Sequence, residues 1–246
     1  MLEINRFIMK LSWDSTDEEK KNAIESLLLI EDKDMHLLLQ PLDKGVWDGA
    51  AEVIVRLGYP RVNVILPGLL VWLQDLNWPG AMRIADFLSE IGDPIVPHVR
   101  DVLKKHKEDE VWIYWLFEQI IDKWDKSKVS QIEEELIDIS NGKINDLRAI
   151  NTLFNHNVFN LVEVKRQLTN KIKGTIIELE ELEKKYSGVD CIELERGFKE
   201  VLFKPELSRK YHEENKELFS YCGYKSYLQE YIREIEELDK EVSNFA

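Results

Sequence analysis

The residues best suited to chemistry or recognition stand together in one short run, W-L-Q-D-L-N-W-P, from Trp72 to Pro79. It places a carboxylate and two amides between two indoles, and two more tryptophans follow about one repeat later. A carboxylate in such a setting can act as a general acid or base, and tryptophan beside carboxylates can anchor a partner protein. We expect partner binding, and the candidate residues are Gln74, Asp75, Asn77, Trp78, Trp112 and Trp115.

The same run also has a purely structural interpretation. Asn77 would cap a helix that starts at Trp78-Pro79, and Asp75 would accept hydrogen bonds from nearby backbone N–H groups. The tryptophans would then fill the seam between helix pairs, since aromatic residues at helical spacing usually lie in a core. Both interpretations hold together if Trp72 lies inside and Trp78 outside.

No other part of the sequence carries a recognised catalytic or metal-binding pattern. The motifs H-E-x-x-H, G-x-x-x-x-G-K-[ST], G-x-G-x-x-G and G-x-S-x-G are missing from it. The five histidines are scattered, and Cys191 and Cys222 stand apart from any ligand at metal spacing. We therefore expect no catalytic residues, no metal and no cofactor, and we expect both cysteines to be buried, reduced thiols.

The charge of the chain narrows the class of partner. The 246 residues include 33 basic and 47 acidic side chains, a net charge of −14, which disfavours binding to nucleic acid or to an anionic membrane. Residues 1–142 hold 16 basic and 27 acidic side chains, whereas residues 143–246 hold 17 and 20. The acidic excess of the first part predicts a basic protein as the partner.

The sequence shows no export signal and no membrane span. Residues 1–11 mix acidic and basic side chains, without the apolar stretch of a secretion signal. The longest apolar run, Val111 to Phe117, has seven residues, against the roughly 20 that a membrane-spanning helix needs. We therefore expect a cytoplasmic protein that does not enter the membrane.

Apolar residues recur at three and four along almost the whole chain, which predicts an all-α protein. Two overlapping capping boxes, at Ser15 and Thr16, predict the start of a first helix. Asn77 and Asp93, each close before a proline, predict the N-caps of two further helices. Asn141-Gly142 predicts a left-handed stop after a helix from about residue 127 to residue 140.

An internal repeat organises the first part of the chain. Residues 51–60 are matched 34 residues later by residues 85–94, and residues 65–73 are matched 30 residues later by residues 95–103. The repeating unit is helix, Gly-x-Pro turn, helix, and an extra turn between Pro60 and Ile65 accounts for the difference in offset. About four such pairs predict a HEAT-like α-solenoid over residues 1–142.

The motifs of this repeat also resemble a known family. The signature W-L-Q-D-x-N-W-P is preceded by L-G-Y-P at residues 57–60 and followed by I-G-x-P-x-V-P at 91–97 and W-x-Y-W at 112–115. Together they resemble a bacterial family of HEAT-like domains of unknown function, over roughly residues 44–120. The resemblance implies a fold and no reaction, because that family has no assigned activity.

The second part, residues 143–246, differs in its apolar pattern. One long stripe predicts a helix of roughly 27 residues from Leu161 to Tyr186. Another helix is predicted from Ile192 to Phe203, and Lys204-Pro205 breaks the helical pattern after it. A stripe from Tyr224 to Leu238 predicts the last helix. We expect this second domain to be a helical bundle or hairpin.

These observations favour a non-enzymatic, acidic, protein-binding solenoid. An immunity protein or an antitoxin-like inhibitor of a basic partner is one instance of that class. Two alternatives stay open: a hydrolase-type enzyme that uses Asp75 in a Trp-lined cleft, and a structural subunit of an oligomer. The sequence leaves open the identity of the partner, the oligomeric state and the role of residues 143–246.

Overall fold

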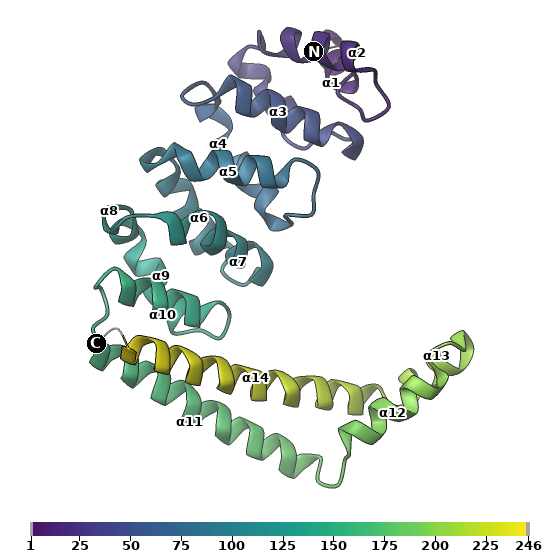
Figure 1. Ribbon diagram of the computed structural model, residues 1–246, viewed down its shortest axis with the longest axis vertical. Helices are drawn as coiled ribbons and strands as arrows, with labels where there is room; N and C mark the ends of the chain where they lie inside the picture. Colours follow the sequence, from purple (N-terminus) through teal and green to yellow (C-terminus); the bar gives the residue numbers. More distant parts are fainter. Residues whose placement is uncertain (1, 245–246) are drawn as a thin grey trace. The chain divides into compact units, whose positions relative to one another are not determined.

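The computed structural model describes residues 2–244 (Figure 1). Over these residues the prediction of an all-α protein is confirmed: there are 14 α-helices, joined by turns and short 3-10 helices, and no strand. The chain divides into two compact units, Met1–Val158 and Phe159–Ala246.

The first unit contains ten α-helices, most of them about three turns long or shorter. They are α1 (Leu2–Met9), α2 (Asp17–Leu27), α3 (Trp47–Leu57), α4 (Leu66–Leu70), α5 (Ala81–Ile91), α6 (Val96–Lys105), α7 (Glu110–Gln119), α8 (Lys126–Val129), α9 (Glu133–Ser140) and α10 (Asp146–Asn155).

These helices pack in two rows that follow the order of the chain (Figure 1). In one row α2 contacts α3, α3 contacts α5 and α5 contacts α7; in the other α4 contacts α6 and α6 contacts α9. Helix α10 lies beside α7, where the side-chain amide of Asn145 donates to the carbonyl oxygen of Glu110 at 3.0 Å. Fully buried apolar side chains such as Ile54, Trp72 and Phe117 fill the unit.

The predicted repeat of helix, Gly-x-Pro turn and helix is confirmed. Helix α3 ends at Gly58 and α5 ends at Gly92, and both glycines have a positive φ, 67° and 77°. A side chain at either position would be strained, so glycine is required where the chain reverses. The extra residues of the first copy lie in the 3-10 helix Arg61–Ile65, which is matched by the shorter Asp93–Ile95.

The capping box predicted at Thr16 is confirmed. The Thr16 hydroxyl accepts the backbone N–H of Glu19 at 3.2 Å, and the Glu19 carboxylate accepts the backbone N–H of Thr16 at 3.0 Å. The helix that it starts, α2, is the second of the chain rather than the first, because α1 precedes it.

Three other predicted helix ends are wrong in detail. Helix α5 begins at Ala81, after a left-handed Gly80 (φ 79°), so Asn77 is not its N-cap. Asp93 makes no side-chain cap and starts a short 3-10 turn before α6. Helix α9 ends at Ser140 as predicted, but it begins only at residue 133 and its C-cap is right-handed (φ −85°), so no left-handed stop follows it directly. The left-handed residue of that loop is Asn145 (φ 55°).

The second unit contains α11 (Leu161–Lys185), α12 (Cys191–Val201), α13 (Pro205–Glu214) and α14 (Lys216–Asn244). The long helix predicted over residues 161–186 is confirmed, and it packs antiparallel to α14 as a helical hairpin (Figure 1). An ion pair of 2.7 Å between Lys165 and Asp239 joins these two helices near one end. Another pair of 2.7 Å, between Lys225 and Glu183, joins them near the other end.

The expectation of two reduced cysteines is wrong. Cys191, at the start of α12, forms a disulfide with Cys222 in α14. The two residues are 31 positions apart in the sequence, and they meet because α12 packs back onto α14. The spacing alone gave no sign of this contact.

The domain boundary expected after residue 142 falls in the loop between α9 and α10. Helix α10 packs closely against α9 and buries Ala149, Ile150 and Leu153, so the first compact unit runs on to Val158. Among the helices of residues 2–244, none has an apolar stretch long enough to cross a bilayer.

Candidate functional site

Two loops of the first unit bring three tryptophans together. Residues 41–48 lead into α3 and residues 74–80 lead into α5, and α3 and α5 pack against each other. The ring of Trp47 lies 6.4 Å from that of Trp72 and 5.6 Å from that of Trp78, edge to face in both cases. We call residues 41–48 and 74–80 the tryptophan edge.

Hydrogen bonds to the backbone fix two of these rings. The indole N–H of Trp47 donates to the carbonyl oxygen of Pro41 at 2.6 Å, and that of Trp72 donates to the carbonyl oxygen of Pro79 at 3.2 Å. Trp72 is fully buried, whereas Trp47 and Trp78 are partly exposed. The arrangement places Trp72 inside and Trp78 at the surface. The run can therefore serve both the packing of the core and the binding of a partner.

A tight turn presents Trp78. The Asp75 carboxylate accepts the backbone N–H of Asn77 at 2.9 Å and its side-chain amide at 3.0 Å, and the backbone N–H of Trp78 donates to the carbonyl oxygen of Asp75 at 3.0 Å. This is the geometry of an Asx turn, in which an aspartate organises its own loop. These contacts are structural, and they bring no second acid or base to Asp75.

The tryptophan edge carries more acidic than basic charge. Its loops contain Asp43, Asp48 and Asp75 against a single basic residue, Lys44. The Lys44 ammonium group lies 5.4 Å from the ring centre of Trp47 and 5.9 Å from that of Trp78. A cation therefore already contacts both exposed rings, in the geometry of a cation–π interaction.

An exposed leucine completes the apolar part of this surface. Leu42 is fully exposed, with a relative accessibility of 109%, and it directly follows the residue whose carbonyl oxygen accepts the Trp47 indole. Single exposed apolar residues are common, but an exposed leucine in the same loop as a partly exposed tryptophan is consistent with an interaction surface.

Four of the six predicted site residues lie in the tryptophan edge, and the other two lie on α7, which packs against the 3-10 helix Val71–Gln74. The four are Gln74, Asp75, Asn77 and Trp78. Trp112 is buried in α7, where its indole N–H donates to the carbonyl oxygen of Leu70 at 3.0 Å. Trp115 is half-buried on the same helix, with its ring 4.8 Å from that of Tyr114.

Sequence reasoning missed Trp47, Lys44 and Leu42. Nothing in the local pattern connects them to the run at Trp72, because α3 separates the two loops along the chain. The repeat could have linked them, because consecutive helix pairs of a repeat place the loops before their first helices at the same end of the stack. These loops are the ones before α3 and before α5.

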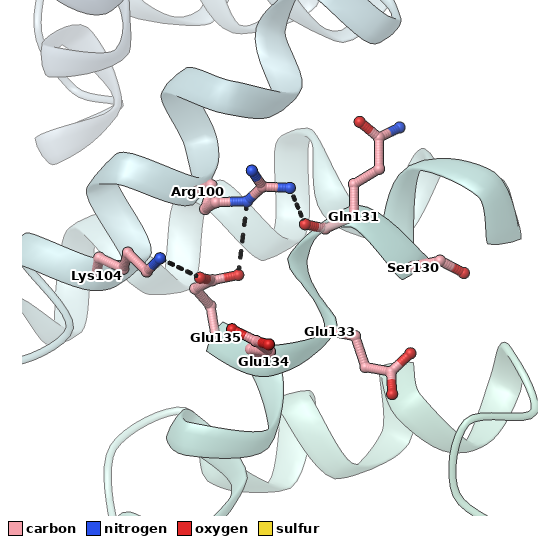
Figure 2. Close-up of a pocket in the computed structure, with 7 residues that line it drawn as sticks. All are labelled: Arg100, Lys104, Ser130, Gln131, Glu133, Glu134 and Glu135. Atoms are coloured by element: carbon pink, nitrogen blue, oxygen red, sulfur yellow. Dashed lines mark hydrogen bonds and ion pairs between the residues drawn. The ribbon is translucent and has the colours of Figure 1, made fainter.

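The acidic run Glu133 to Glu135 lines a separate hollow of about 420 Å³ between α6 and α9 (Figure 2). Glutamates at the start of a helix are ordinarily solvated, but the side chain of Glu135 is only 5% exposed and lies 3.1 Å from Lys104 and 3.8 Å from Arg100. Figure 2 shows Glu133 extending away from these cations. The acidic side chains of this hollow are therefore largely neutralised by its own lysine and arginine, so its surface is not uniformly acidic.

Comparison with known proteins supports a domain in this part of the chain without assigning it a function. Residues 40–153 match a domain of unknown function (DUF5071), a range that contains the whole tryptophan edge. No curated protein and no solved structure matches the chain.

Proposed function

We propose that the first unit is a HEAT-like helical solenoid that binds a basic protein through the tryptophan edge and catalyses no reaction. The two rows of successive helices and the repeated Gly-x-Pro turn support the solenoid part of this proposal. Inhibition of a basic toxin, in the manner of an immunity protein, is one activity that such a surface would serve.

One observation carries the proposal. Trp47 and Trp78 form a partly exposed aromatic surface: the indole N–H of Trp47 is held by the carbonyl oxygen of Pro41, and the ring of Trp78 packs edge to face on it at 5.6 Å, so both rings are largely ordered before binding. Tryptophan is enriched among the residues that dominate binding energy, and a pre-ordered side chain loses little entropy when a partner arrives.

The charges around these rings favour a basic partner. Three aspartates and one lysine lie in the loops of the tryptophan edge, and residues 1–142 as a whole carry an excess of 11 acidic side chains, 27 against 16. Complementary charge speeds encounter and selects the partner, and its effect falls as salt screens it. An arginine or lysine of the partner would replace or join Lys44 over the indole rings.

Affinity capture with a matched pair of variants tests the proposal. The tagged protein, its Trp78→Ala variant and a Phe203→Ala control are used to capture proteins from the cells that produce it. Phe203 is also an exposed aromatic residue, at 92%, but it belongs to the second unit. We expect a basic protein to be retained by the wild type and the control, and to be lost from Trp78→Ala.

Quantitative binding then decides the result. Trp78→Ala is expected to weaken the complex by roughly 30-fold, the effect of losing about 2 kcal/mol at a hot spot. Binding should also weaken as salt rises. A partner that binds Trp78→Ala as tightly as the wild type, or whose affinity is independent of salt, contradicts the proposal.

A further inference from the structure

A second hollow of the first unit has the features of a small-molecule site. It measures about 420 Å³ and lies where the end of α7 and the loop after it face α10. This volume falls in the range of about 300–1,000 Å³ that is typical of ligand pockets. It does not include any residue of the tryptophan edge.

The first observation that points to a ligand is an unsatisfied donor. Trp124 lines the hollow and is 6% exposed, and its buried indole N–H has no hydrogen-bond partner among the described residues. Trp47, Trp72 and Trp112, in the same unit, each donate to a backbone carbonyl oxygen. A buried donor without an acceptor is rare in folded proteins and calls for an explanation.

The second observation is a polar stripe on α10. Arg148, Asn151, Thr152, Asn155 and His156 all line the hollow, at spacings of three and four that place them on one face of the helix. The amides of Asn151 and Asn155 form no hydrogen bond with other described residues, so each offers both a donor and an acceptor.

The one guanidinium that lines the hollow is paired with two carboxylates. Arg148 lies 2.6 Å from Glu118 and 3.1 Å from Asp122, and its guanidinium stacks 4.4 Å from the ring centre of Tyr114. Loss of solvent lowers the pKa of His156, which keeps the imidazole neutral at pH 7, and it raises the pKa of Asp122. No unpaired cation is left to hold an anion.

We propose that this hollow binds a neutral, hydroxyl-rich small molecule of about the size of a sugar. A hydroxyl group both accepts and donates, so it can take the Trp124 N–H and at the same time donate to an asparagine carbonyl or to Asp122. The amides and the imidazole of the stripe on α10 suit several such groups at once, while the Thr152 hydroxyl is already bonded to Asp122. The site is independent of the protein-binding surface proposed above.

Nuclear magnetic resonance of the tryptophan indole N–H signals tests this site. The ¹⁵N-labelled full chain is titrated with glucose, N-acetylglucosamine, myo-inositol and trehalose, and then with inorganic phosphate and glucuronate. The Trp124 signal is assigned from the Trp124→Phe variant, which keeps an aromatic ring and removes only the donor. We expect at least one neutral probe to shift this signal saturably, with millimolar or tighter affinity.

Two variants and a control sharpen the result. Asn155→Ala, a change at an exposed position, and Trp124→Phe should each weaken the affinity for that probe about 10-fold, as expected for a lost hydrogen bond. Because Trp124→Phe has lost the indole signal, its affinity is followed through the side-chain amide signal of Asn151, which lines the same hollow. Trp115→Phe should leave the affinity unchanged. The proposal is overturned if no neutral probe shifts the signal, if only the anions do, or if Trp124→Phe binds as tightly as the wild type.

Discussion

The disulfide between Cys191 and Cys222 gives the most quantitative prediction for the second unit. A cross-link stabilises a fold mainly by restricting the unfolded chain, and the closed loop spans 31 positions. In the chain-entropy treatment a loop of that length contributes about 3.7 kcal/mol at 25 °C. Reduction should therefore lower the free energy of unfolding of this unit by about 3–4 kcal/mol.

Hydrogen exchange measures this loss where it occurs. Peptides from α12 and α14 should exchange about 10²- to 10³-fold faster after reduction, since each 1.4 kcal/mol is a tenfold change. Peptides from α5 and α6 are the internal control, because they belong to the first compact unit. A Cys191→Ser/Cys222→Ser double variant should behave like the reduced protein under both oxidising and reducing conditions.

Two results would refute this reasoning. Unchanged protection of α12 and α14 after reduction would show that the cross-link does not constrain the unfolded chain as supposed. An equal loss of protection in α5 and α6 would show that the two compact units unfold as one, so that the effect cannot be assigned to the second unit.

Three further predictions concern the first unit. Glu135→Gln should lower its free energy of unfolding by about 1–2 kcal/mol in urea denaturation, because the substitution removes the buried carboxylate that pairs with Lys104. The expected loss is kept to this size because the Lys104 side chain is largely exposed and solvent weakens the ion pair. A hydrogen bond from Lys10 and the capping box lower the pKa of Glu19 to about 2, so carboxyl NMR should find its midpoint there, and this stabilising contribution should be lost as the pH falls from about 4.5 to about 2. Gly80→Ala should lower the free energy of unfolding by about 2 kcal/mol in thermal denaturation, because φ is 79° and the new Cβ would lie 2.6 Å from another side-chain carbon. A titration midpoint near 4.5 for Glu19 would contradict the second prediction. An unchanged free energy of unfolding in Glu135→Gln or in Gly80→Ala would contradict the first or the third.

The fold was predictable where a local pattern and the packing agree. Local sequence determines local structure in three cases: the apolar period of the helices, the capping box at Thr16, and the glycines at residues 58 and 92. The start of α5 was not predictable from Asn77, because the Asx turn with Asp75 uses that side chain and a left-handed Gly80 starts the helix instead.

Contacts between distant segments account for the other failures. The cysteine pairing depends on α12 folding back onto α14, and the burial of Glu135 depends on α6 supplying cations from the neighbouring pair. The expectation of reduced thiols followed from the expected cytoplasmic location, and disulfides are more typical of oxidising compartments. The cytoplasm stays a prediction.

The candidate site was predictable in part. The run from Trp72 to Pro79 identified the loop that presents Trp78, but a single sequence does not show that Trp47 packs on it from the loop before α3. Nor does it distinguish Trp112, whose indole is buried and bonded to Leu70, from a tryptophan at the surface.

A footprint of the captured partner on this chain tests the central claim most directly. Hydrogen exchange of the purified complex is compared with that of the free protein. The account predicts slower exchange in residues 41–48 and 74–80 when the partner is bound, with α11 and α14 unchanged. Protection confined to segments outside these two loops, with residues 41–48 and 74–80 exchanging as in the free chain, would contradict it.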